Sequence, residues 1–133
     1  MSASYKDLVA WQQGMELVEL IHEFSTKWPR SEVYGLVSQV RRAAVSVVSN
    51  IAEGQGRNSR GEFLQFLGNA RGSLLETETQ ILVAQRLKYL NGEESRRAVD
   101  KIDRVSRLLY GLMQSLNGSA GPKTRNQKPE TKN

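Results

Sequence analysis

Apolar side chains return every three or four residues over most of this chain, and that spacing constrains its fold more than any other feature. The step matches the 3.6-residue turn of an α-helix, so each run places its apolar residues along one stripe. Four such runs follow one another, without the strict apolar and polar alternation of strands. Long helices with short connections pack as antiparallel neighbours, so the sequence predicts an all-α, antiparallel up-and-down four-helix bundle.

The four predicted helices cover about residues 7–28, 32–55, 60–90 and 93–116, within one domain of residues 1–116. Capping residues and helix breakers set these limits. In chain order they are Pro29, Ser31 with Glu32, Gly54 and Gly56, the Ser59 and Glu62 capping box, and Asn91-Gly92. The residues expected to face the core are Leu8, Trp11, Met15, Val18, Ile21, Phe24 and Trp28; Leu36, Val40, Ala44, Val47 and Ile51; Phe63, Leu67, Ala70, Leu74, Ile81 and Ala84; and Ala98, Ile102, Val105, Leu109, Leu112 and Leu116.

The composition excludes several classes of protein. With 38% apolar and 25% charged residues, the bulk of the chain is typical of a globular protein. The chain has no cysteine, which excludes disulfides, thiolate metal sites and cysteine nucleophiles and suits a reducing compartment. No run of about 18 apolar residues is present, so we expect a cytoplasmic protein with no membrane partner.

The positive charge is concentrated near the C-terminus. Residues 117–133 contain Lys123, Arg125, Lys128 and Lys132 against Glu130, which accounts for three of the formal net charges of +5. These residues have no apolar periodicity, so we expect a disordered basic tail that adds non-specific attraction to phosphate. The bundle itself carries little net charge.

A polar stripe accompanies the apolar one on each of the two central helices. On the second helix it contains Gln39, Arg42, Ser46, Asn50 and Glu53, and on the third it contains Asn69, Ser73, Glu76 and Gln80. If the two helices form a hairpin, Arg42 lies within about one turn of Glu76, which predicts an ion pair. Two interpretations stay open: a partly buried network that fixes helix register or a subunit interface, and a face toward a ligand or nucleic acid.

No arrangement of residues predicts catalysis or metal binding. Glu19 and His22 match one Glu-x-x-His element of a di-iron bundle, but the site needs two such elements and His22 is the only histidine. Gly54-Gln55-Gly56 lacks the strand and the Gly-Lys-Ser/Thr sequence of a phosphate-binding loop, so it indicates a helix end and a turn. We therefore expect no active site, no metal and no cofactor.

Arginine positions give the candidate nucleic-acid contacts. In the fourth helix, Glu93 with Arg97, Asp100 with Arg104 and Asp103 with Arg107 are acid-first pairs four residues apart, which indicates a self-neutralised face. Arg41, Arg42, Arg57 and Arg60, around the second helix and the turn after it, have less compensation, and Arg42 is assigned to the polar stripe. We take Arg41, Arg57 and Arg60 as candidate phosphate contacts, with ordinary solvent-exposed arginine as the alternative.

Two segments of the sequence resemble a known family. QVRRAAVSVVSNIAEGQGR, residues 39–57, and EFLQFLGNARGSLLETETQ, residues 62–80, resemble the four-helix-bundle proteins encoded in intervening sequences of bacterial large-subunit ribosomal RNA genes. The resemblance covers about residues 5–116 and implies ring-like homopentamers with no known enzymatic activity. That family is related to the accessory variability determinant of diversity-generating retroelements, a pentameric bundle that binds nucleic acid and a reverse transcriptase.

From the residues and this resemblance together, we expect a non-enzymatic homo-oligomeric bundle, a pentamer, that binds nucleic acid. Structured RNA or a nucleoprotein is the expected partner. The alternative is a protein-binding scaffold or adaptor that docks a partner such as a reverse transcriptase without contacting nucleic acid. Phosphate contacts release counterions, so steep salt dependence of binding distinguishes the two.

Overall fold

A computed structural model of the chain describes residues 4–118 and confirms the predicted all-α four-helix bundle. The long helices are α1 (Val9–Ser25), α2 (Leu36–Gln55), α3 (Arg60–Arg86) and α4 (Gly92–Gly118). Two short 3-10 helices, η1 (Tyr5–Asp7) and η2 (Arg30–Glu32), precede α1 and α2. The described residues contain no strand.

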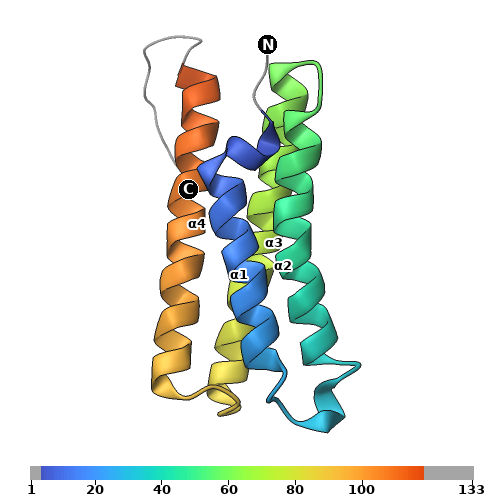
Figure 1. Ribbon diagram of the computed structural model, residues 1–133, viewed down its shortest axis with the longest axis vertical. Coiled ribbons are helices and arrows are strands. Elements are labelled where there is room, and N and C mark those ends of the chain that lie inside the picture. The colour runs from blue at the N-terminus through green and yellow to red at the C-terminus, as the bar shows by residue number, and fades with distance from the viewer. Residues whose placement is uncertain (1–3, 119–133) are drawn as a thin grey trace.

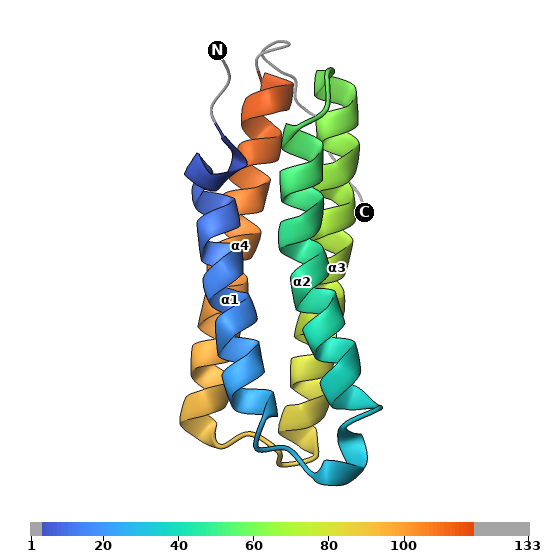
Figure 2. The ribbon, with the colours of Figure 1, turned by 45° about the vertical axis from the view of Figure 1, so that its right-hand side comes forward.

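The four helices run antiparallel to their neighbours in chain order around one core (Figure 1). Contacts join α1 to α2, α2 to α3, α3 to α4 and α4 back to α1, so each helix has two neighbours. One end of the bundle holds the α2–α3 connection, residues 56–59, beside the last turn of α4, and we call it the turn end (Figure 2). The other end holds residues 26–35 and 87–91, and we call it the loop end.

Apolar residues from all four helices fill the core, as the periodicity predicts. The fully buried side chains include Leu17, Ile21, Phe24, Val40, Val47, Ile51, Leu67, Ile81, Val105 and Leu109. The prediction for Met15 is wrong, because its side chain is 37% exposed and Leu17 takes the inward position instead. The α1 stripe is rotated toward Ala10 and Gly14, and a Cβ on Gly14 would lie 2.7 Å from Val48 Cγ1. These small residues let α1 approach α2 closely.

The helix limits at the loop end differ from the predicted ones. α1 ends at Ser25, and α2 begins at Leu36, four residues later than predicted. Ser31 is exposed and lies within η2, so it does not cap α2. Gly35 occupies the cap position and has no side chain to accept a hydrogen bond, so Glu32 Oε1 accepts one from the Leu36 amide at 3.1 Å.

The connection between α3 and α4 also differs from the prediction. α3 ends at Arg86, and Lys88 adopts a left-handed conformation with φ of 66°. Asn91 does not close α3; it precedes α4 and caps it, because Asn91 Oδ1 accepts from the Glu94 amide at 2.8 Å and Glu94 Oε1 accepts from the Asn91 amide at 3.0 Å. This reciprocal pair is a capping box that the sequence analysis missed.

The predicted capping box at the start of α3 is present in its first half, because Ser59 Oγ accepts from the Glu62 amide at 3.1 Å. α4 continues to Gly118, two residues into the segment predicted as a tail. The rest of that tail, residues 119–133, lies outside the described residues. Within residues 4–118, no helix has both the length and the apolar character needed to cross a bilayer.

Candidate functional site

The polar stripes of α2 and α3 meet at the middle of the bundle. The hydroxyl groups of Ser46 and Ser73 are 2.7 Å apart in a hydrogen bond that joins the two helices. Asn50 Nδ2 donates to Ser46 O at 2.8 Å and to Ser46 Oγ at 3.1 Å. Thr77, which is fully buried, donates its hydroxyl to Ser73 O at 2.9 Å. The structure therefore brings Ser46, Asn50 and Ser73 together as a half-buried link within one chain.

The remaining members of the stripe lie outside this link. Gln39, Arg42, Glu53, Asn69 and Glu76 are exposed. A hollow of about 290 Å³ lies between α2 and α3 and is lined by Gln39, Arg42, Ala43, Ser46, Glu76 and Gln80. In the part of the chain that the structure describes, Gln80 Oε1 is buried and accepts no hydrogen bond.

The predicted ion pair between Arg42 and Glu76 is wrong. Both side chains line the same hollow, but no ion pair joins them in residues 4–118. Arg42 Nη2 instead donates to Ser38 Oγ at 3.0 Å, one turn earlier on its own helix. Exposed long side chains gain little from pairing in water, so a neighbour on the same helix face competes successfully.

The side chain of Arg41, on α2, contacts the C-terminal end of α1. Its Nε donates to Ser25 Oγ at 2.8 Å, and its Nη2 donates to Thr26 Oγ1 at 3.1 Å and to His22 O at 3.3 Å. A cation at this position interacts favourably with the helix dipole and with a terminal carbonyl group. The half-buried guanidinium of Arg41 therefore contributes to the α1–α2 packing, at a distance from the other two candidate arginines.

Arg57 and Arg60 lie at the turn end. Arg57 Nη2 contacts Glu53 Oε2 at 2.8 Å, and its guanidinium carbon lies 4.7 Å from the centre of the Phe66 ring. Arg60 Nη1 donates to Leu116 O at 3.0 Å, which joins the first turn of α3 to the end of α4. The structure thus brings Arg57 and Arg60 to one end of the bundle and leaves Arg41 elsewhere.

Charged side chains of both signs line the groove between α1 and α4. Lys101 Nζ donates to Gln13 Oε1 at 2.8 Å and to Glu16 Oε1 at 2.7 Å, and its hydrogen bond lowers the pKa of Glu16. The guanidinium carbon of Arg97 lies 5.3 Å from the centre of the Phe24 ring.

Only one of the three predicted acid-first pairs forms within the described residues. Asp103 and Arg107 contact each other at 2.8 Å. The other two predicted pairs are absent from the ion pairs of residues 4–118, because Arg97 lies over the Phe24 ring instead of pairing with Glu93, and Asp100 makes no ion pair with Arg104.

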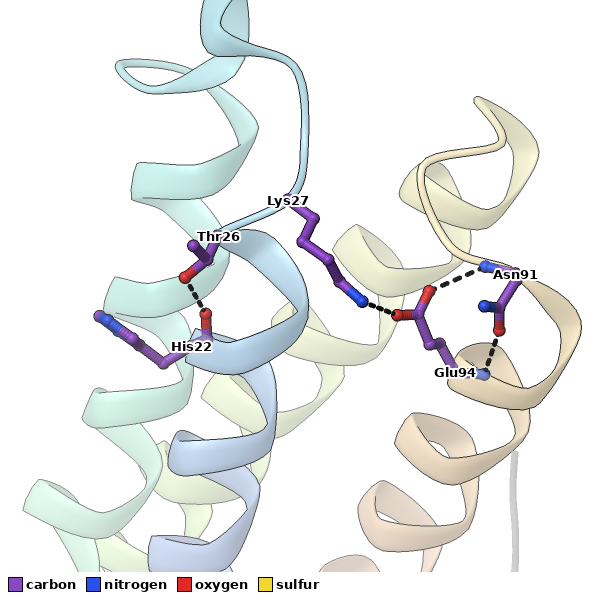
Figure 3. A network of polar contacts seen from close by, with 5 residues as sticks. All are labelled: His22, Thr26, Lys27, Asn91 and Glu94. Atoms are coloured by element: carbon purple, nitrogen blue, oxygen red, sulfur yellow. Dashed lines mark hydrogen bonds and ion pairs between the residues drawn. The ribbon is translucent and has the colours of Figure 1, made fainter.

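At the loop end, an ion pair joins the end of α1 to the start of α4 (Figure 3). Lys27 Nζ lies 2.6 Å from Glu94 Oε2, while Glu94 Oε1 caps α4 through the Asn91 amide. The Lys27 hydrogen bond and then the Asn91 amide lower the pKa of Glu94, and Glu94 in turn raises the pKa of Lys27. His22 is exposed nearby, and no three potential metal-binding side chains gather anywhere in residues 4–118.

A second contact at the loop end joins the start of α2 to the end of α3. Tyr89 donates its hydroxyl to Glu32 Oε2 at 2.8 Å, while Glu32 Oε1 accepts from the Leu36 amide. The Leu36 amide and then the Tyr89 hydroxyl lower the pKa of Glu32, and the hydrogen bond to Glu32 raises the pKa of Tyr89. Sequence reasoning missed this contact, since nothing local connects residues 57 positions apart.

Large apolar side chains also remain on the surface, and sequence reasoning missed most of them. They are Val9, Met15, Val33, Tyr34, Val45, Leu75, Leu82, Val83, Leu87 and Tyr110. The available signal was the spacing on α3, where Gly61, Gly68, Leu75 and Leu82 are each seven residues apart. A seven-residue repeat beside the core stripe is typical of a second helix-packing surface.

Comparisons with known proteins agree with this architecture. Residues 6–111 match the family described as 23S rRNA-intervening sequence protein. A solved structure of a protein with unknown function from the S23 ribosomal protein family, from Bacteroides thetaiotaomicron VPI-5482, has a TM-score of 0.75 to this chain at 22% identity. The similarity covers 82% of this chain and 98% of that one, and at this identity it establishes the fold alone. No curated protein sequence matches the chain.

Proposed function

This chain belongs to the 23S rRNA-intervening sequence protein family, and from that premise we propose that it is a non-enzymatic homo-oligomer, a pentamer, that binds nucleic acid. Structured RNA, free or within a nucleoprotein, is the proposed ligand. Neither the family description nor the structural relative names a catalytic activity, so the proposal makes binding the function.

The observation that carries the proposal is the contact between Arg60 and Leu116 at the turn end. Arg60 Nη1 lies 3.0 Å from Leu116 O, and this hydrogen bond joins the first turn of α3 to the last turns of α4. Arg57 lies in the α2–α3 connection, just before α3. In the sequence, the residues that follow α4 include four further cations, at Lys123, Arg125, Lys128 and Lys132. Two of the three candidate arginines, Arg57 and Arg60, therefore belong to the end of the bundle from which these cationic residues follow in the sequence.

Repetition compensates for the low charge of each bundle. The net charge of residues 1–116 is small because acidic residues offset most of the cations, so a single copy would bind nucleic acid weakly. A ring presents the same cations five times at fixed spacing, so later contacts with one RNA become intramolecular and avidity rises. We therefore expect the intact oligomer to bind far more tightly than any isolated subunit.

The test is the solution mass by light scattering, with and without a short hairpin RNA, at low and at moderate salt. The proposal expects a mass near five chains that increases with RNA and returns to the protein value as salt rises. A monomeric mass that does not change when RNA is added would contradict both the proposed assembly and the proposed function.

A pair of variants locates the groups that bind phosphate. Arg57→Gln with Arg60→Gln should lower the slope of log K against log salt by roughly 0.7 to 0.9 for each phosphate that the variant no longer neutralises. Arg96→Gln with Arg104→Gln, two exposed arginines of α4, removes the same charge elsewhere and should leave the slope closer to wild type. Equal slopes for both double variants would mean that RNA does not bind at the turn end.

The rival function is a protein-binding scaffold, and one feature of the loop end favours it. Tyr34 is 97% exposed and Val33 is 45% exposed, on a connection that Glu32 holds in place. An aromatic side chain so fully open to solvent suits a protein interface. Partner binding that persists at high salt and is abolished in Tyr34→Ser would favour this rival.

A further inference from the structure

Exposed and half-buried apolar side chains gather on two of the four faces of the bundle. The first, the α1/α2 face, consists of Trp11, Met15, Val18, Val45 and Ala52. The second, the α3/α4 face, consists of Leu64, Gly68, Leu75, Leu82, Val99 and Tyr110. Both faces therefore differ from an ordinary hydrated helix surface.

Contacts inside the bundle locate the α1/α2 face. Gly14 of α1 meets Val48 of α2, so residues 11–18 run alongside residues 45–52. Met15 lies two residues after Gln13, which contacts α4, so it points about 200° away from that neighbour. Val45 and Ala52 lie three residues before and four after Val48, one turn away on either side.

Similar reasoning locates the α3/α4 face. Ser73 of α3 contacts α2, and Leu75, two residues later, lies about 200° further round the helix, on the side toward α4. Leu82 and Gly68 share its position in the seven-residue repeat. On α4, Lys101 contacts α1, and Val99, two residues earlier, lies on the opposite side, toward α3.

Each helix packs mainly against its neighbours in chain order and α4 packs against α1, which gives the arrangement of helices in Figure 2. The α1/α2 and α3/α4 faces therefore lie on opposite sides of the bundle. The faces between them carry more polar and charged side chains. The α2/α3 face carries Gln39, Arg42, Glu53, Asn69 and Glu76, and the α1/α4 groove carries Glu16, Glu19, Glu23, Arg97, Lys101 and Arg104 around Leu20. Apolar and polar faces thus alternate around the bundle.

From this alternation we infer that the α1/α2 face of one copy packs against the α3/α4 face of the next copy. The inference rests on the proposed homo-oligomer and identifies its interface. Two different faces on opposite sides give head-to-tail contacts, and these close into a ring when the rotation between copies allows it. A face that packed against itself would form a dimer and leave the other apolar face in water.

The shape of the α3/α4 face suits another helical bundle. A Cβ added to Gly61, Gly68 or Gly72 would meet no atom within 4 Å, so the first half of α3 is a shallow, open surface. Leu75 and Leu82 project from the second half, at 51% and 44% exposure. Bulkier side chains such as Trp11 and Met15 of a neighbouring copy can lie over the glycines of this surface.

The size of the faces is sufficient for a stable contact. The repeat from Gly61 to Leu82 extends about 30 Å along the helix, and two helices side by side are roughly 20 Å wide. The buried area is then roughly 600 Å² on each copy, near the lower limit of specific interfaces. Arg71, Glu78 and Arg86 lie one turn from Leu75 or Leu82 on α3, and Arg96, Asp103 and Arg107 lie one turn from Val99 or Tyr110 on α4, so the face also carries charges of both signs.

The experiment uses one variant on each face of the full chain. Val45→Glu disables the α1/α2 face, and Leu75→Glu disables the α3/α4 face; both positions are about half exposed, so the fold tolerates the change. Each purified variant should be a monomer by light scattering, with a wild-type circular dichroism spectrum. Leu87→Glu, at an exposed leucine outside both faces, is the matched control and should keep the wild-type mass.

Mixing the two variants is the decisive step. Each retains the face that the other lacks, so the mixture should form a heterodimer with the mass of two chains and no larger species. If Val45→Glu or Leu75→Glu fails to fold, Met15→Glu and Leu82→Glu replace them on the same faces.

Each other result identifies what is wrong. A wild-type monomer overturns the proposed assembly and this inference together. A wild-type oligomer that survives both substitutions overturns the face assignment and leaves the assembly standing. Variants that dimerise alone, or a mixture that stays monomeric, overturn the head-to-tail arrangement.

Discussion

The α2/α3 pair and the α1/α4 pair are held together by different kinds of contact. Between α2 and α3, the contacts use short side chains: Gly54 against Phe66 at the turn end and Ser46 with Ser73 in the middle. Between α1 and α4, the polar contacts use long charged side chains, Lys101 with Glu16 in the middle and Lys27 with Glu94 at the loop end.

This difference indicates which helices have a fixed separation and register. Short side chains allow one separation and one register between helices, because a shift of a few tenths of an ångström breaks their contacts. Lysine and glutamate have several rotatable bonds and stay in reach over a range of separations. We therefore expect α2 and α3 to act as the rigid half of the molecule, and α1 and α4 to adapt to it.

The largest effect should follow from Gly54→Ala. A Cβ at this position would lie 2.7 Å from Phe66 Cβ and 3.3 Å from the Phe63 carbonyl oxygen, and neither atom can move without moving the helix. We expect a loss of about 1–3 kcal/mol in the free energy of unfolding, measured by urea denaturation.

Gly111→Ala is the control for that loss, since an added Cβ there meets nothing within 4 Å. It should stabilise the protein by up to about 1 kcal/mol through helix propensity alone. Equal stability of the two variants would mean that α2 and α3 are no more tightly packed than the rest.

The second effect concerns the hydrogen bond between Ser46 and Ser73. Ser73→Ala should cost about 1 kcal/mol, because the half-buried Ser46 hydroxyl loses its partner on α3. The double variant with Ser46→Ala should cost less than the sum of the two single variants. Strict additivity in the urea midpoints would show that the two hydroxyls do not cooperate across the pair.

A smaller effect, confined to acid pH, should follow from Glu32→Gln. The pKa of Glu32 is lowered in the folded protein, so its contribution to stability is present above the ordinary carboxyl range and is lost as the pH falls below that range through the lowered pKa. The fall in Tm between neutral and acid pH should therefore be shallower in the variant. Glu76→Gln, at an exposed carboxylate that makes no ion pair within residues 4–118, serves as the control.

The smallest effect should follow from Lys101→Gln, which removes the contacts with Gln13 and Glu16. The Glu16 side chain is 55% exposed, and solvent screens an ion pair of this kind. The loss of Tm should be measurable at low salt and should vanish above about 0.5 M salt. A loss of Tm that persists at high salt would mean that specific packing, and not a screened ion pair, holds α1 against α4, as it holds α2 against α3.

The fold was largely predictable because its signal repeats along every helix. Positions such as Val47, Leu67 and Val105 recur at helical spacing, and an error at one of them does not alter the pattern. Met15 shows the limit of this reasoning. Its hydropathy predicts that Met15 is buried in preference to Gly14. However, Val48 lies so close to α1 that a glycine, and not a larger residue, occupies the buried position.

The candidate site was less predictable because it depends on single contacts between distant residues. Glu32 replaces Ser31 in capping α2, partly because Tyr89 holds its carboxylate. Arg41 lies against the end of α1, although its sequence neighbours indicate only an exposed cation. The prediction that RNA contacts Arg41, Arg57 and Arg60 stays a prediction.

The two helix pairs also differ in the length of chain that must be closed to form them. Ser46 and Ser73 are 27 residues apart, whereas Lys101 and Gln13 are 88 apart. The entropy of closing the longer loop is greater by about 1 kcal/mol. The α2–α3 hairpin should consequently form first during folding and exchange its amide hydrogens last, while α1 and α4, at the two ends of the chain, close around it late and open early.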